Sequence, residues 1–188
     1  MNVPNFLTSL RIVLAVLFLW LLFLAGLPAK ILALPAFSAA SITDYWDGRL
    51  ARQNNQITSF GRLMDPIADK VLTLFAFVAF VRLDLVAAWM VAVIIAREVF
   101  ITLVRLVMPS KGASQEARTS GKQKTVLQIT VIVCILIFIC LRETSFWRPE
   151  WSGTALQFIH YGMLLIVAIT LWSGIRYIAI NRKILFRL

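Results

Sequence analysis

Six long apolar stretches occupy nearly the whole sequence and constrain its fold more than any other feature. A helix that crosses a bilayer core of about 30 Å needs about 20 apolar residues. The stretches lie at residues 6–26, 31–52, 62–81, 84–108, 122–141 and 154–180. The chain is 60% hydrophobic, against about 45–50% for soluble domains. We therefore predict an all-α, polytopic membrane protein with six transmembrane helices, forming a single domain over residues 1–188.

Lysine and arginine are distributed unevenly between the two sides that six spans define. Fifteen of the 19 fall on the side of both termini and the second and fourth connections, and the other side holds only Lys30, Arg82, Arg142 and Arg148. Because cytoplasmic loops are rich in these residues, we expect both termini to be cytoplasmic. We interpret the net charge of +10 as topology and contact with membrane lipids, and expect no nucleic-acid partner. The first stretch could also serve as a signal peptide, but we expect it to be retained as a span.

Four aspartates stand where the second and third stretches face each other. Asp44 and Asp47 are three residues apart on one predicted helix, and Asp65 and Asp69 are four apart on the next. Residues at these spacings share a helix face. Because the connection between the two helices is short, we expect antiparallel neighbours whose two acidic pairs meet at a common depth, near the cytoplasmic face.

Such a cluster needs compensation for its negative charge. Two carboxylates about 5 Å apart repel by about 3 kcal/mol at an effective dielectric constant of 20. Mg²⁺ and Mn²⁺ prefer carboxylate oxygen, and two such cations would neutralise four aspartates. The small residues Gly48, Ala51 and Gly61 leave space beside the acids. We therefore predict a site for two divalent cations with room for a diphosphate.

Two other interpretations of the acids are weaker. A single aspartate pair at a helix end is usually a cap or a solvated turn, but two pairs on adjacent apolar helices are not. Acids inside membranes also mark ion pathways, so a divalent-cation carrier is an alternative. The four acids gather near one interface and are not spread through the spans, which favours a binding site over a pathway.

The complete motif is similar to the signature of a known family. It contains eight fixed positions within 26 residues: Asp44, Asp47, Gly48, Ala51, Arg52, Gly61, Asp65 and Asp69. This spacing resembles that of the CDP-alcohol phosphotransferases. Segments elsewhere resemble the bacterial phosphatidylglycerophosphate synthase branch of that family, namely Asn2–Arg11, Ala96–Glu98 with Arg105, Gly121–Thr125, and Leu171–Ser173 with Tyr177.

The resemblance implies a chemistry for the aspartates. Asp44, Asp47, Asp65 and Asp69 would bind two Mg²⁺ or Mn²⁺ ions, and Asp69 would also be the general base for the acceptor hydroxyl. The donor would be CDP-diacylglycerol. The positions that resemble the family's CDP-lipid contacts are Asn5, Thr8, Gly48, Ala51, Arg52 and Gly61.

The resemblance also implies an acceptor, sn-glycerol 3-phosphate. Its phosphate needs cations, and the candidates are Arg97, Arg105, Arg118, Lys122 and Lys124. Glu98, in the same span as Arg97, would neutralise a neighbouring cation. Phosphatidylglycerol, inositol phosphate or serine are alternative acceptors. We expect a homodimer in a bacterial cytoplasmic membrane, with the active site facing the cytoplasm.

Overall fold

The computed structural model describes the backbone of residues 3–53, 59–107 and 115–185, and the side chains of residues 10–42, 70–104 and 124–180. Within those ranges the chain forms six α-helices. They are α1 (Val3–Phe23), α2 (Leu27–Gln53), α3 (Ser59–Arg82), α4 (Ala88–Val107), α5 (Gln115–Arg142) and α6 (Glu150–Leu185). The predicted all-α architecture with six long helices is therefore confirmed for the described part of the chain.

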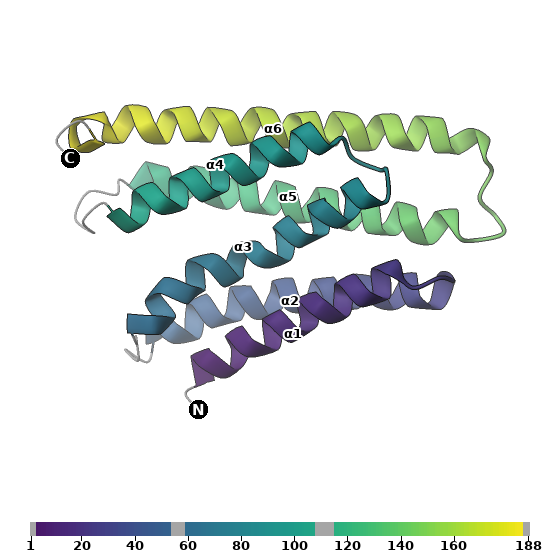
Figure 1. Cartoon of the computed structure of the whole chain (residues 1–188), viewed down its shortest axis with the longest axis horizontal. Coiled ribbons are helices and arrows are strands. Elements are labelled where there is room, and N and C mark those ends of the chain that lie inside the picture. The colour runs from purple at the N-terminus through teal and green to yellow at the C-terminus, as the bar shows by residue number, and fades with distance from the viewer. Residues whose placement is uncertain (1–2, 54–58, 108–114, 186–188) are drawn as a thin grey trace.

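The helices run alongside one another as an up-and-down bundle (Figure 1). The start of α1 and the end of α6 lie at the same end of the bundle, on the left of the view, as do the end of α2 and the start of α3. Helix α1 packs on α2 and α3, α4 packs on α3 and α6, and α5 contacts α2, α3 and α6. This topology places the start of α1 and the end of α6 at one end of the bundle, which is the arrangement that an even number of antiparallel helices gives.

The core consists of apolar side chains from all six helices. Phe18 and Phe37, both fully buried, bring α1 and α2 together with ring centroids 5.3 Å apart. The α1–α2 turn follows from Gly26, whose φ of 94° is a left-handed conformation that glycine adopts without strain. The buried ammonium of Lys30 donates to the Leu22 carbonyl, which satisfies a carbonyl at the end of α1.

Several predicted helix bounds are wrong by three to seven residues. Helix α2 begins at Leu27 and not at 31, and α6 runs from Glu150 to Leu185 and not from 154 to 180. Helix α4 begins at Ala88 and not at 84, because Asp84 has a φ of 56° and ends α3 in a left-handed turn. The Leu85 N–H donates to the Phe80 carbonyl across that turn (3.0 Å), which is a Schellman cap. Helix α1 ends at Phe23, before the predicted 26.

Helix α5 begins at Gln115, seven residues before the predicted 122. The sequence places the residues before 122 outside the apolar stretches, because they contain no apolar run. Glutamate, alanine and arginine in the first turn of α5 have high helix propensity, so polarity alone was a poor guide to where the helix begins.

Two described segments are long and apolar enough to cross a membrane, judged by length and composition. They are Lys124–Arg142, with mean hydropathy 2.5, and Glu150–Ile180, with mean hydropathy 1.9. Shorter apolar stretches occupy Leu10–Phe23 and Leu27–Ile42. Large apolar side chains also lie on the outside of the bundle, among them Phe158, 74% exposed, and Trp172, 69% exposed. Packing within the bundle therefore does not cover all of the large apolar side chains of the described helices.

Candidate functional site

The aspartate motif lies on α2 and α3, as predicted. Asp44 and Asp47 belong to the second half of α2, and Asp65 and Asp69 to the first half of α3. The end of α2 and the start of α3 lie at the same end of the bundle (Figure 1), so the backbone brings the two acidic segments to one region. The side chains of these four residues are outside the described ranges, and their convergence therefore stays a prediction.

Other predicted residues are placed by their helices alone. Gly48, Ala51 and Arg52 lie on α2, and Gly61 lies on α3. The remaining residues whose side chains fall outside the described ranges are Asn5 and Thr8 on α1, Arg105 on α4, and Arg118 and Lys122 on α5. Their proposed contacts with the donor or the acceptor stay predictions.

A charged cluster in the described part of the bundle includes Lys70, the residue that follows the motif in α3. We call it the Glu98 cluster; it comprises Glu98 and three cations, Lys70, Arg97 and Lys124. The Lys70 ammonium lies 3.0 Å from Oε2 of Glu98, Arg97 Nη1 lies 3.4 Å from Oε1, and the Lys124 ammonium contacts the same Oε1. Helices α3, α4 and α5 thus meet at one carboxylate.

The cluster is largely shielded from the surroundings. The side chains of Glu98 and Lys124 are 8% and 5% exposed, and that of Lys70 is 31% exposed. Burial of charged groups is unfavourable unless they are paired and hydrogen-bonded. The convergence of four charged groups inside an apolar bundle therefore marks a candidate functional site.

Thr102, one turn after Glu98, also contacts Lys70. Its hydroxyl donates to the Glu98 carbonyl at 2.7 Å and accepts a hydrogen bond from the Lys70 ammonium. The same ammonium lies 3.4 Å from the Glu98 carbonyl oxygen. Lys70 is therefore held by side-chain and backbone oxygens of α4.

Helix α6 holds Arg97 from the other side. Arg97 Nη2 donates to Ser173 Oγ at 2.9 Å, and the Ser173 hydroxyl donates to the Thr170 carbonyl at 3.0 Å. The next residue, Gly174, faces Arg97. A Cβ there would lie 3.4 Å from both Cγ and Nε of Arg97, so the space has room for a methyl group but not for a longer side chain. Four helices, α3 to α6, therefore contribute to the region around the Glu98 cluster.

The structure brings together two of the predicted acceptor-binding residues, Arg97 and Lys124, through Glu98. Sequence reasoning had linked Glu98 to an unnamed cation and had missed Lys70 and Ser173 as contacts. The position of Lys70 directly after Asp69 was the available signal. The pairing itself depends on how far α3 and α4 are shifted along each other, which local spacing does not determine.

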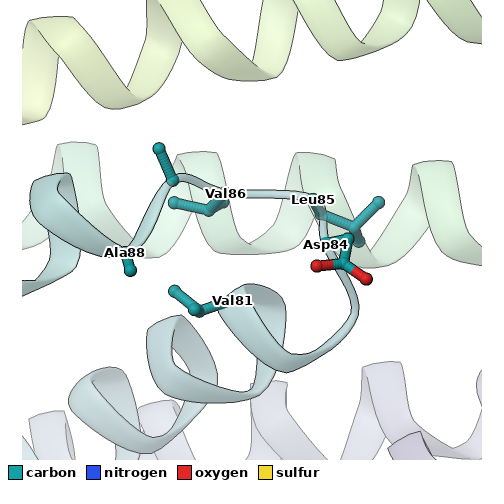
Figure 2. Close-up of a pocket in the computed structure, with 6 residues that line it drawn as sticks. Val81, Asp84, Leu85, Val86 and Ala88 are labelled. Carbon is teal, nitrogen blue, oxygen red and sulfur yellow. The ribbon is translucent and has the colours of Figure 1, made fainter.

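A shallow hollow of about 420 Å³ lies at the far end of the bundle, at the α3–α4 turn (Figure 2). Its lining consists of Val81, Asp84, Leu85, Val86, Ala87 and Ala88. Figure 2 shows the Asp84 carboxylate beside aliphatic side chains. No cationic side chain is among these lining residues, so this hollow does not suit a phosphorylated ligand.

Comparison with known proteins identifies relatives over nearly the full length. The model of the family described as CDP-alcohol phosphatidyltransferase matches residues 1–176. The chain is 34% identical to the CDP-diacylglycerol–glycerol-3-phosphate 3-phosphatidyltransferases of Salmonella typhimurium strain LT2 and Escherichia coli strain K12. Each alignment covers 96% of this chain and 95% of the relative.

Proposed function

We propose a specific reaction for this chain, which belongs to the CDP-alcohol phosphatidyltransferase family. It transfers the phosphatidyl group of CDP-diacylglycerol to sn-glycerol 3-phosphate, and the products are phosphatidylglycerophosphate and CMP. The observation that carries this proposal is the similarity over 96% of the chain to two enzymes named for that reaction. Membership of a transferase family also favours this reaction over the divalent-cation carrier.

The aspartates of α2 and α3 provide the chemistry in this proposal. An acceptor hydroxyl oxygen attacks the phosphorus that bears the diacylglycerol, the bond from that phosphorus to the CMP oxygen breaks, and CMP leaves with the bonding electrons. Asp69 accepts the proton of the attacking hydroxyl. General-base catalysis of this kind contributes about 10²–10⁴-fold to a rate, and close positioning of the hydroxyl adds to it.

The donor set fits two divalent cations, either Mg²⁺ or Mn²⁺. Asp44, Asp47, Asp65 and Asp69 offer carboxylate oxygens from two helix segments that lie at the same end of the bundle (Figure 1). Hard cations prefer such ligands. Cations bound there supply Lewis-acid stabilisation of the charge on the diphosphate and on the departing CMP.

The donor lipid is proposed to bind along α1, α2 and α3. The residues assigned to it are Asn5, Thr8, Gly48, Ala51, Arg52 and Gly61. The three small residues of this set leave room for the nucleotide and the diphosphate next to the acids, and the arginine supplies a positive charge for phosphate.

The acceptor phosphate is proposed to bind at the cations of α4 and α5. Arg97 and Lys124 already converge at Glu98, and Lys70 joins them from α3. Arg105, Arg118 and Lys122 belong to the same two helices and are assigned to the same phosphate. A site with this many cations favours a phosphorylated acceptor over serine.

The protein is proposed to be a single membrane domain. The exposed apolar side chains of α6 suit contact with lipid tails, and the excess of lysine and arginine at the end with both termini indicates a cytoplasmic location for that end. In a bacterial cytoplasmic membrane this arrangement gives the site access to water-soluble sn-glycerol 3-phosphate. We also propose a homodimer, following the family resemblance.

An acceptor panel tests the proposed reaction. Purified protein in detergent with Mg²⁺ and CDP-diacylglycerol would be offered sn-glycerol 3-phosphate, inositol phosphate, phosphatidylglycerol or serine, and the lipid products would be identified by mass spectrometry. We expect phosphatidylglycerophosphate to dominate. Faster formation of another phosphatidyl product would reassign the acceptor while leaving the family membership intact.

The contact of Arg97 with Ser173 and Gly174 of α6 gives a prediction about acceptor binding. Gly174→Leu is expected to raise the KM for sn-glycerol 3-phosphate by about 10- to 100-fold, which is the range for losing a hydrogen bond to a charged group. The reason is that the larger side chain must push Arg97 away from Ser173. Initial rates at varied acceptor concentration would measure it.

Gly174→Ala is the matched control for this prediction, because a single Cβ would lie at 3.4 Å from Arg97, close to ordinary contact distance. Its KM for the acceptor should stay within about twofold of the wild-type value. An unchanged acceptor KM in Gly174→Leu would show that Arg97 does not contribute to acceptor binding.

A further inference from the structure

We propose that Glu98 is a positioning residue for the acceptor phosphate. Its carboxylate is an internal anion that keeps Lys70, Arg97 and Lys124 together in the arrangement that the phosphate requires. This inference rests on the proposed function and adds to it a residue that binds no substrate itself.

Glu98 forms ion pairs with three cations at once. Oε2 pairs with Lys70 of α3 at 3.0 Å, and Oε1 pairs with both Arg97 of α4 and Lys124 of α5. Both carboxylate oxygens are used, and cations from three helices are held by one buried side chain, 8% exposed.

Without an anion between them, the three cations would repel one another. Positive charges that all contact one carboxylate lie close enough to repel one another, and this repulsion is stronger inside a shielded bundle than in water. Flexible lysine side chains would respond by turning to new partners, because their ammonium groups have no fixed orientation. Glu98 therefore supplies the negative charge that makes convergence possible before the acceptor arrives.

The same carboxylate links the acceptor cations to the aspartate motif. Lys70 directly follows Asp69 in α3, and its ammonium is held on α4 by Glu98 and Thr102. These contacts restrain the turn of α3 that begins after the proposed general base. Arg97 is held on α6 through Ser173. Loss of Glu98 would thus disturb acceptor binding and the alignment of the attacking hydroxyl together.

This arrangement predicts a selective kinetic defect. Glu98→Gln keeps the size of the side chain and removes its charge. The variant is expected to raise the KM for sn-glycerol 3-phosphate about tenfold or more and to lower kcat, while the KM for CDP-diacylglycerol stays within about twofold of wild type. Glu98→Asp, which keeps the charge on a shorter side chain, should recover part of both losses.

The experiment measures both KM values and kcat for wild type, Glu98→Gln, Glu98→Asp and the control Glu143→Gln, an exposed acid beyond the end of α5. Size-exclusion profiles in detergent would show whether each variant is folded. A fall in kcat alone, with both KM values unchanged, would show a purely structural role and overturn the proposal. A lower KM for the acceptor would also overturn it, because Glu98 would then be repelling the phosphate.

A double-mutant cycle with Lys124→Met tests whether Glu98 acts through its partners. Because contacting residues couple, the effect of Glu98→Gln on the acceptor KM should shrink at least about threefold when Lys124 is already replaced. Fully multiplicative effects would contradict the proposal. If Glu98→Gln does not fold, Glu98→Asp takes its place in the cycle. The proposal would then be overturned if Lys124→Met raises the acceptor KM while Glu98→Asp leaves the acceptor KM equal to that of wild type.

Different outcomes test the proposed reaction and the role of Glu98. Wild-type protein that forms no phosphatidylglycerophosphate would contradict the proposed function itself. Wild-type protein that forms the product, together with a Glu98→Gln variant whose acceptor KM is unchanged, would contradict only the role of Glu98.

Discussion

Replacing Asp69 by asparagine is expected to lower CMP release at least about 1000-fold. The substitution removes the proposed general base, which alone accounts for about 10²–10⁴-fold, and takes a negative charge from the proposed metal ligands. Asparagine is nearly the same size, so the helix and its packing should be retained. Steady-state release of CMP at saturating donor and acceptor would measure the effect.

Asp84→Asn is the matched control for that variant. The chemical change is identical, but Asp84 lies at the α3–α4 turn, at the opposite end of the bundle from the motif (Figure 1). Its left-handed backbone, with φ 56°, is one that asparagine also adopts readily. The control should keep nearly full activity, and more than a tenth of wild-type turnover in Asp69→Asn would contradict the role assigned to Asp69.

Removing divalent cations is expected to lower turnover at least about 100-fold. Four carboxylates at one site need cations to offset their repulsion, and charge on the diphosphate and on CMP needs stabilisation during transfer. Protein treated with a chelator and passed over a desalting column would be assayed before and after Mg²⁺ or Mn²⁺ is restored.

Two features make the metal experiment specific. Restored Mg²⁺ or Mn²⁺ should return most of the activity, which excludes irreversible damage by the chelator. Asp44→Asn should need a higher cation concentration for half-maximal activity than the Asp84→Asn control. Full activity after complete chelation would contradict a metal-dependent mechanism.

The number of helices could be predicted because each helix contains a long apolar stretch. These stretches must be covered by lipid or by neighbouring helices, and that requirement is visible in the order of residues alone. Helix ends were less predictable, because they depend on local backbone geometry. The left-handed turn at Asp84 ends α3 and delays the start of α4 to Ala88. A non-glycine residue with a positive φ is uncommon, so an aspartate in the sequence does not by itself indicate that conformation.

The candidate site was predictable in part. The spacing of the aspartates indicated their helices and, through the family resemblance, their chemistry. The meeting of Lys70, Glu98 and Lys124 was not predictable, because those residues lie on three helices whose relative shift along the bundle is set by packing of the whole core. The same reason explains why Ser173 of α6 was not assigned as a partner of Arg97.

The central claim is that this chain transfers a phosphatidyl group to sn-glycerol 3-phosphate. The most direct measurement counts CMP and lipid product together, with purified protein, CDP-diacylglycerol and Mg²⁺, in the presence and absence of the acceptor. We predict that CMP is released only when sn-glycerol 3-phosphate is present, and in equal amount to phosphatidylglycerophosphate. CMP release that is independent of the acceptor, or no release at all, would contradict the claim.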